Sequence, residues 1–322
     1  LVLPEIGRKR DGDTMIAFLD EPKIAELLDM AALIEVEAAA LAAFSRGEVI
    51  QPERTVLNAE AAGGFFLTMP AIGDAMGIKM VTLFPGNADL GLHTHHALIT
   101  MFNPATGEPL AVMDGRLITE MRTAAVSAVA TRHLADPNAR VLAILGSGVQ
   151  AKSHLEAMRL VRDFDEVRVW SRTPANAKAF ADTHGATAMG IEDAVKGADI
   201  VVCATTAFEP VLSGAWLKPG AHVNAVGWNS PEGRELDDDA MTNVVVVESR
   251  DGALSGAGNI RGSGCAIHGE IGQIINGAVA APSAEATTIF DSIGMAIEDI
   301  AAAGLVLAKY QGFVVEQGFV NE

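Results

Sequence analysis

The segment at 140–151, RVLAILGSGVQA, constrains the fold more than any other part of the chain. A short apolar run typical of a buried strand ends in glycines and continues into a helix-forming stretch. Gly146, Gly148 and Ala151 match the G-x-G-x-x-G/A spacing, in which the glycines permit a tight turn and a close approach of the backbone to a pyrophosphate. The pattern predicts a dinucleotide at a helix N-terminus, with a glycine turn in some other α/β unit as the alternative. The predicted cofactor site also includes Ser147, Val149 and Gln150.

The end of the next predicted strand narrows the choice of cofactor. After EVRVW at 166–170 the chain continues with Ser171, Arg172 and Thr173, where an NAD-specific site usually has a carboxylate for the ribose 2′-hydroxyl. Two hydroxyls and a guanidinium instead suit a 2′-phosphate, because arginine binds phosphate with a fixed fork of donors. The sequence therefore predicts NADPH, with NADH as the second candidate. The alternative is that Arg172 is a solvated loop residue.

Composition argues against several classes of partner. With 23 Lys and Arg against 41 Asp and Glu, the formal net charge is -18, which repels nucleic acids and anionic membranes. Apolar runs are interrupted well before the ~18 residues that a membrane span needs. Two cysteines make the reduced cytoplasm the simplest setting, and residues 1–14 lack the apolar core of a secretory signal and predict an extension. No metal is expected at His93, His95 and His96, because adjacent strand residues point to opposite faces.

Strand and helix patterns divide the chain into two predicted domains. An α/β fold, a Rossmann doubly wound parallel sheet, is predicted over 122–291 from alternating helices and strands, the strands at 141–146, 166–171, 199–204, 221–226 and 244–248. Residues 15–121 instead combine alanine-rich helices with short apolar runs separated by turn signals. They predict a second, α+β domain with a mostly antiparallel sheet. A last helical run at 292–311 is long enough to pack back on it, so this domain is assigned 15–121 and 292–322.

Three basic residues of the α+β domain stand out because their surroundings are apolar or turn-like. Arg54 lies in QPERTVL, Lys79 in GIKMVTLFPGN and Arg122 in TEMRTAAVSAVA. A lysine within a hydrophobic strand must reach water or meet an anion. Arg122 is expected to open a small-residue helix and to contribute to ligand binding far more than to the core. If the three converge they would bind a carboxylate, although each taken singly is more often a surface residue.

Short segments spread over most of the chain carry a resemblance to a known family: IKMVT, LAVMDG, RTAAVSAVAT, LGSGVQA, HVNAVG, RELD and TTIFDSIGMAIED. In this order and spacing they resemble the ornithine cyclodeaminase/mu-crystallin family of NAD(P)-dependent enzymes. The resemblance implies a homodimer whose first domain supplies the dimer sheet and the substrate site. It also implies that Arg54, Lys79 and Arg122 hold the substrate carboxylate. Four further residues are expected along the cofactor, with strand-end capping as the alternative for the threonines: Thr205, Thr206, Val226 and Gly294.

Members of this family include cyclodeaminases, alanine dehydrogenases and imine reductases, so the reaction depends on individual residues. Where cyclodeaminases have an Asp after the strand in NAVG, this chain has Asn229, an amide that cannot act as a carboxylate base. This departure, and the match of Ser171 to Thr173 to the ketimine-reductase branch, favour NADPH-dependent reduction of α-imino acids to L-amino acids. Candidate substrates are Δ1-pyrroline-2-carboxylate and Δ1-piperideine-2-carboxylate, and Lys79 is the candidate for relaying a proton if the arginines lower its pKa. The alternatives are an ornithine cyclodeaminase, an alanine or other amino-acid dehydrogenase, and a non-catalytic, crystallin-like NADPH-binding protein.

Overall fold

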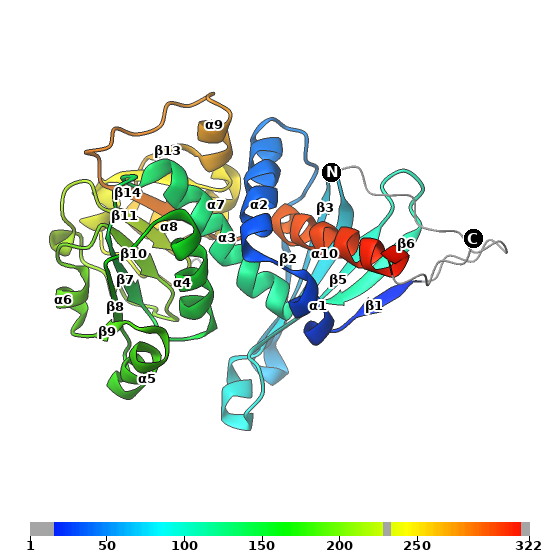
Figure 1. Cartoon of the computed structure of the whole chain (residues 1–322), viewed down its shortest axis with the longest axis horizontal. Coiled ribbons are helices and arrows are strands. Elements are labelled where there is room, and N and C mark those ends of the chain that lie inside the picture. The colour runs from blue at the N-terminus through cyan, green and yellow to red at the C-terminus, as the bar shows by residue number, and fades with distance from the viewer. Residues whose placement is uncertain (1–15, 228–232, 317–322) are drawn as a thin grey trace. The chain divides into compact units, whose positions relative to one another are not determined.

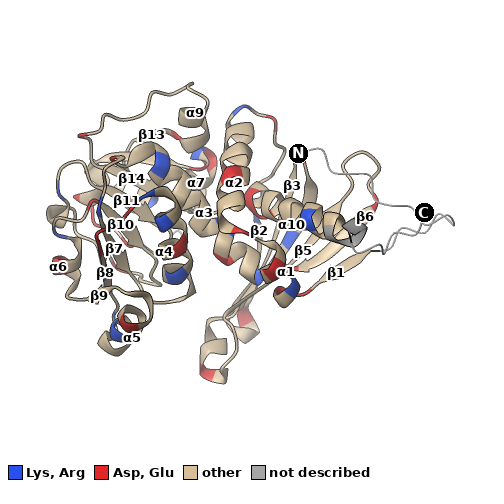
Figure 2. Cartoon of the chain, viewed as in Figure 1, with Lys and Arg blue, Asp and Glu red and all other residues tan. Residues whose placement is uncertain are grey.

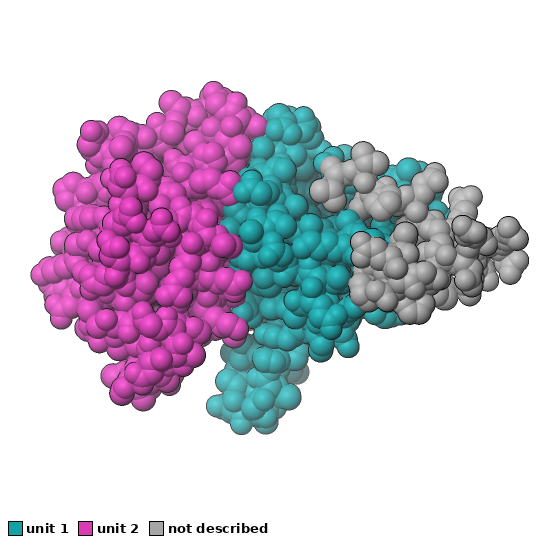
Figure 3. Space-filling view, in the orientation of Figure 1, with its two compact units in different colours: residues 1–122, 295–322 teal, residues 123–294 magenta. Residues whose placement is uncertain are grey.

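The computed structural model describes residues 16–227 and 233–316, so the predicted extension at 1–14 and Asn229 lie outside the described residues. The chain divides into two compact units, which are residues 1–122 with 295–322 and residues 123–294 (Figure 3). Each unit is built on its own sheet, six-stranded in the first and eight-stranded in the second over the described residues (Figure 1). In the same part of the chain, no helix combines the length and the apolar character that crossing a membrane requires.

The first unit has a mixed sheet in which five strands form an antiparallel meander. Among the strands that the structure describes in this unit, only the short β1 pairs in parallel, with β6, and the order is β1-β6-β5-β4-β3-β2. The predicted mostly antiparallel sheet is confirmed. Its strands are β1 (Ala17–Leu19), β2 (Thr55–Ala59), β3 (Gly64–Ile72), β4 (Met76–Leu83), β5 (His95–Phe102) and β6 (Pro109–Asp114).

Three helices cover one face of this sheet: α1 (Glu21–Leu27), α2 (Met30–Ser45) and α10 (Ala296–Glu316) (Figure 1). Aspartates cap the first two, because the Asp20 carboxylate accepts from the Lys23 amide at 3.0 Å and that of Asp29 from the Ala32 amide at 2.9 Å. Helix α10 packs on α2 and on β3, β4 and β5. The helix predicted from residue 292 thus begins at Ala296, four residues later.

The second unit is an all-parallel sheet of order β13-β12-β14-β11-β10-β7-β8-β9. The five predicted strands are present, and the order reverses between β7 and β10, the place where open α/β sheets bind ligands. The sequence assigned no element to β14, which lies between β11 and β12. The strands are β7 (Val141–Leu145), β8 (Glu166–Trp170), β9 (Thr187–Ala188), β10 (Ile200–Cys203), β11 (His222–Ala225), β12 (Val244–Val247), β13 (Ile267–Glu270) and β14 (Thr288–Asp291).

Helices pack on both faces of the parallel sheet, which confirms the doubly wound fold. On one face, alternate strand residues such as Ala143 and Val201 share a buried core with α6 (Ile191–Val195), α7 (Arg250–Gly256) and α8 (Gly258–Ser263). On the other, the Asn224 amide of β11 donates to the Thr131 hydroxyl of α3 (Arg116–Leu134) at 2.9 Å. The remaining helices are α4 (Val149–Val161), α5 (Pro174–His184) and α9 (Ile271–Ile275).

Candidate active site

The glycine loop between β7 and α4 has the geometry of a pyrophosphate cradle. Gly146 has φ +123°, and a Cβ there would lie 2.4 Å from the Ala204 carbonyl oxygen, so a side chain is excluded on both counts. A Cβ on Gly148 would have no atom within 4 Å. Gly148 is also the N-cap of α4 and brings no side chain to the first amides of the helix. Open space at a helix N-terminus fits a diphosphate, so the loop suits the dinucleotide that its sequence predicts.

The residues predicted to choose between NADH and NADPH follow β8. The Ser147 hydroxyl of the glycine loop donates to the Ser171 hydroxyl at 3.0 Å, which ties the two loops together. Arg172 and Thr173 are exposed, and within the described residues no ion pair engages Arg172. Of the other loop residues, Val149 is exposed, and the side-chain oxygen of the half-buried Gln150 lacks a hydrogen-bond partner. The exposed guanidinium of Arg172 is therefore accessible to an anion.

A buried glutamate that sequence reasoning missed, Glu235, joins the ends of two central strands. Its carboxylate accepts from the Thr205 amide at 2.7 Å, the Thr205 hydroxyl at 2.6 Å and the Gly227 amide at 2.7 Å. Burial raises the pKa of Glu235 to about 7, against these hydrogen bonds, which lower it. The Thr205 hydroxyl is thus bound within the protein, whereas Thr206 is exposed. The predicted Val226 is buried, and its amide donates to the Cys203 carbonyl at 2.9 Å.

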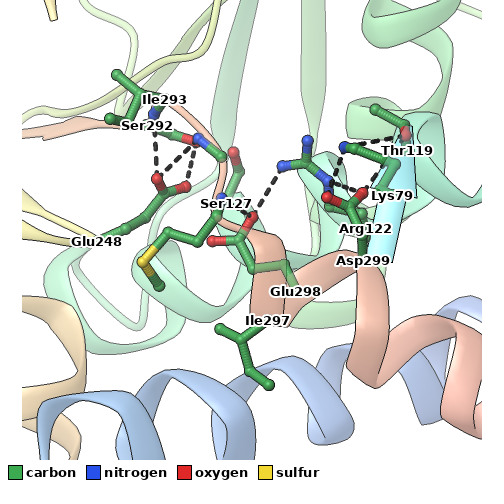
Figure 4. Close-up of polar contacts among 12 residues, drawn as sticks. Lys79, Thr119, Arg122, Ser127, Glu248, Ser292, Ile293, Ile297, Glu298 and Asp299 are labelled. Atoms are coloured by element: carbon green, nitrogen blue, oxygen red, sulfur yellow. Dashed lines mark hydrogen bonds and ion pairs between the residues drawn. The ribbon is translucent and has the colours of Figure 1, made fainter. Parts of the chain in front are cut away.

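A second buried glutamate, Glu248 after β12, holds the segment that follows β14 (Figure 4). Its carboxylate accepts from the Ile293 amide at 3.0 Å, from the Gly294 amide at 2.9 Å and from the Ser292 hydroxyl. Gly294 has φ +71°, a conformation that favours glycine. The predicted cofactor residue Gly294 is therefore fixed through its backbone, and its own amide is already bound.

The structure brings two of the predicted cations of the first unit together in a buried cluster, and the third acts on it electrostatically. Lys79 points inward from β4 with an exposed fraction of 2%, and Arg122 lies on α3 with 6%. Arg54, half-buried before β2, is close enough for its charge to lower the pKa of Lys79. The prediction that Arg122 opens its helix is wrong, because α3 begins at Arg116, where the Asp114 carboxylate accepts from the backbone amide at 2.8 Å.

Two acidic residues of α10 complete this cluster, and sequence reasoning missed both (Figure 4). Asp299 lies 2.5 Å from the Lys79 Nζ and 3.0 Å from the Arg122 Nε, and Glu298 lies 2.8 Å from an Arg122 Nη. Both acids are fully buried. The motif TTIFDSIGMAIED contains them, but acids are ordinary in the first turn of a helix, where the dipole favours them. Glu298 and Asp299 can therefore be told apart from ordinary helix-start acids only by their ion pairs in the folded chain.

Burial and charge shift the titration of this cluster. Burial lowers the pKa of Lys79 to about 8, with Asp299 raising it and Arg122 and Arg54 lowering it. Burial raises the pKa of Asp299, but Arg122 and Lys79 outweigh it, and the net shift is downward. His95 is neutral, because burial and the nearby cations lower its pKa to about 4. The protonation state of Lys79 therefore depends on its charged neighbours as well as on its burial.

Arg122 contributes to the fold more than its sequence predicts. It is buried between Glu298 and Asp299, both of which are themselves out of contact with water. Its removal would leave two buried carboxylates without that cation, a change that typically costs about 3–5 kcal/mol of stability. Its burial and its two ion pairs therefore predict a contribution to the stability of the fold in addition to the predicted role in ligand binding.

Comparison with known proteins places the chain in a family. Ketimine reductase mu-crystallin of Mus musculus is 45% identical over 301 residues, which cover 90% of this chain and 96% of the relative. The structure of Thermococcus litoralis Δ1-pyrroline-2-carboxylate reductase in complex with NADH and L-proline has a TM-score of 0.88 and 34% identity, over 94% of this chain and 98% of that one. An archaeal alanine dehydrogenase dimer with bound NAD has a TM-score of 0.87 and 31% identity, over 94% of this chain and 97% of that one. The model of the ornithine cyclodeaminase/mu-crystallin family matches residues 14–312, and the chain belongs to that family.

Proposed function

We propose that the protein is an NADPH-dependent reductase that converts α-imino acids to L-amino acids. The observation that carries the proposal is the buried cluster of Lys79 and Arg122, with Arg54 beside it, in the same chain as a dinucleotide cradle. A protein that only stored NADPH would not need these three cations to bind a substrate carboxylate. Related proteins named for ketimine and Δ1-pyrroline-2-carboxylate reduction support the reaction class. The preference for NADPH rests on Ser171, Arg172 and Thr173, since the related reductase structure contains NADH.

In the proposed reaction the C=N bond of the substrate gains a hydride at carbon and a proton at nitrogen. A reduced nicotinamide, when bound, supplies the hydride. Arg54 and Arg122 hold the substrate carboxylate and so fix the position of the imine. Lys79, with a pKa of about 8, is mostly protonated at neutral pH, so its Nζ can give a proton to the imine nitrogen and take one back in the reverse direction.

We also propose that the first unit forms the dimer contact, through the sheet face opposite its helices. The six strands hold only two charged residues: Lys79, which points inward, and Asp114 (Figure 2). The outer face presents large apolar side chains, including Leu57 at 56%, Leu98 at 49% and Phe18 at 77% exposed. Apolar faces of this kind usually mark association sites. We propose that a second copy of the chain binds to this apolar face of the sheet.

An absorbance assay tests the reaction class. NADPH should be consumed with Δ1-pyrroline-2-carboxylate or Δ1-piperideine-2-carboxylate, while L-ornithine with NAD⁺ should release no ammonia, because Asn229 offers no carboxylate base. Arg54→Gln should lower kcat/KM by roughly 10- to 150-fold, the equivalent of losing about 1.5–3 kcal/mol in a charged hydrogen bond. Arg46→Gln, which removes an exposed arginine from the same unit, is the control. Ammonia release from ornithine at a rate matching imine reduction would overturn the proposal.

A further inference from the structure

Asp299 contacts two buried cationic side chains, one from strand β4 and one from helix α3 (Figure 4). One carboxylate oxygen lies 2.5 Å from the Lys79 Nζ of β4, and the other lies 3.0 Å from the Arg122 Nε of α3. The Thr119 hydroxyl lies 3.4 Å from both the Lys79 Nζ and Asp299. The ammonium of Lys79 is therefore held by one strong charged contact and one weak hydroxyl contact.

The first turn of α10 is itself fixed, so the position of Asp299 is set by the backbone. The Met295 amide donates to the Glu298 carboxylate at 3.0 Å, and the Ile297 amide donates to the Gln51 side chain at 2.9 Å. These contacts satisfy amides that the start of a helix leaves without intrahelical partners. A carboxylate in this turn is also favoured by the helix dipole. Asp299 thus has little freedom to follow a displaced lysine.

We propose that Asp299 is the positioning residue that keeps the Lys79 ammonium in place and protonated for its reaction with the substrate nitrogen. This inference rests on the proposed function. The charged and titratable groups that face Lys79 are Asp299 from α10, Arg122 from α3, Arg54 from before β2 and the neutral His95 from β5. Of these, Asp299 is the group that favours the charged lysine, while burial and the two arginines oppose it.

Glu298 provides a matched comparison within the same helical turn. It is as buried as Asp299, but its carboxylate contacts Arg122 and the Met295 amide. Glu298→Gln and Asp299→Asn each remove one negative charge from the cluster with little change in shape. Only Asp299→Asn removes the charge that contacts Lys79. Asp182→Asn, at an exposed ion pair with Lys178 in the second unit, controls for the chemical change itself.

The pH dependence of Δ1-pyrroline-2-carboxylate reduction is the first readout. In the parent protein kcat/KM should fall as the pH rises through about 8, where Lys79 loses its proton. In Asp299→Asn the midpoint should move down by about one pH unit or more, because a favourable charge has been removed. In Glu298→Gln and Asp182→Asn it should move much less. L-Proline oxidation is the reverse reaction and needs the Lys79 side chain as a neutral amine that can accept a proton. It should therefore begin at lower pH in Asp299→Asn. Titration of the imine itself is common to all variants and cannot produce these differences.

NMR of protein labelled with [¹³Cε]lysine measures the Lys79 midpoint without any turnover, with the signal assigned by Lys79→Arg. The same downward shift is expected in Asp299→Asn, and an unchanged midpoint there would overturn the inference. If the parent protein reduces no imine but the shift is seen, the proposed function fails while the control of Lys79 by Asp299 stands. If Asp299→Asn does not fold, Asp299→Glu replaces it: retained charge should keep the midpoint, while the longer side chain displaces the ammonium and lowers kcat. A lower midpoint of the Lys79 titration in Asp299→Glu would also contradict the inference.

Discussion

At the scale of single residues, the candidate site consists of cations that are paired with acids from distant parts of the chain. Lys79 stands out within an apolar strand because a buried lysine needs a counter-charge. Asp299 and Glu235 do not stand out, since one lies at a helix start and the other in a short polar motif, where acids are common. Their roles depend on partners far away in the sequence, at Lys79 and Thr205 respectively. Only the folded chain shows these distances.

Cofactor selectivity is a prediction for one exposed residue. Arg172→Ala should weaken NADPH binding by about 1.5–3 kcal/mol, the range for a hydrogen bond to a charged group, and leave NADH binding nearly unchanged. The reason is that the guanidinium would contact only the 2′-phosphate, which NADH lacks. Calorimetric titration with each cofactor measures both affinities, and Lys178→Ala, at an exposed pair on α5, is the control. An equal loss of affinity for the two cofactors would contradict the prediction that Arg172 binds the 2′-phosphate.

At the scale of elements, the sequence predicted the buried four-residue strands β10 and β11 but not β14, which has the same length and burial. A short buried strand shows no alternation between apolar and polar residues, and β14 runs directly into the segment that was predicted as the last helix. The starts of α3 and α10 depend on caps from side chains outside the helices, Asp114 for α3 and Gln51 for α10. Gln51 lies far from α10 in the sequence. The last turn of α3 likewise depends on a distant side chain, that of Arg162.

The C-terminus of α3 should owe part of its stability to Arg162. This half-buried guanidinium donates to the carbonyls of Thr131 at 3.0 Å, Ala135 at 2.9 Å and Asp136 at 3.0 Å. Arg162→Met should lower the free energy of unfolding by about 1.5–3 kcal/mol, because these carbonyls lose a charged donor. Urea unfolding followed by circular dichroism measures the loss. Arg159→Met, which removes a single 3.1 Å contact with the His184 carbonyl, should cost clearly less, and equal losses would contradict the capping role.

At the scale of the whole molecule, the sequence predicted the two sheet types because each follows from a pattern that repeats along the chain. Alternating helices and strands gave the parallel sheet, and short apolar runs between turns gave the antiparallel one. Alternation does not by itself show which face of a sheet is covered by helices. The structure settles this for the first unit: Lys79 and Met101 point to the covered face, and Leu98 points to the exposed one. The apolar composition of the exposed face thus becomes evidence for association.

Leu98 lies near the middle of that exposed face, since its neighbours across the sheet are Met80 on β4 and Asp114 on β6. Leu98→Lys should therefore place a charge inside the proposed dimer contact, where an ion pair with the neighbouring Asp114 would not offset the cost of losing its hydration. The parent protein should elute as a dimer in size-exclusion chromatography with light scattering, and the variant should shift toward monomer. Leu160→Lys, at a leucine of similar exposure on α4, should leave the dimer intact. A parent protein that is monomeric, or a Leu98→Lys variant that dimerises as tightly as the parent, would show that this face is not the contact between subunits.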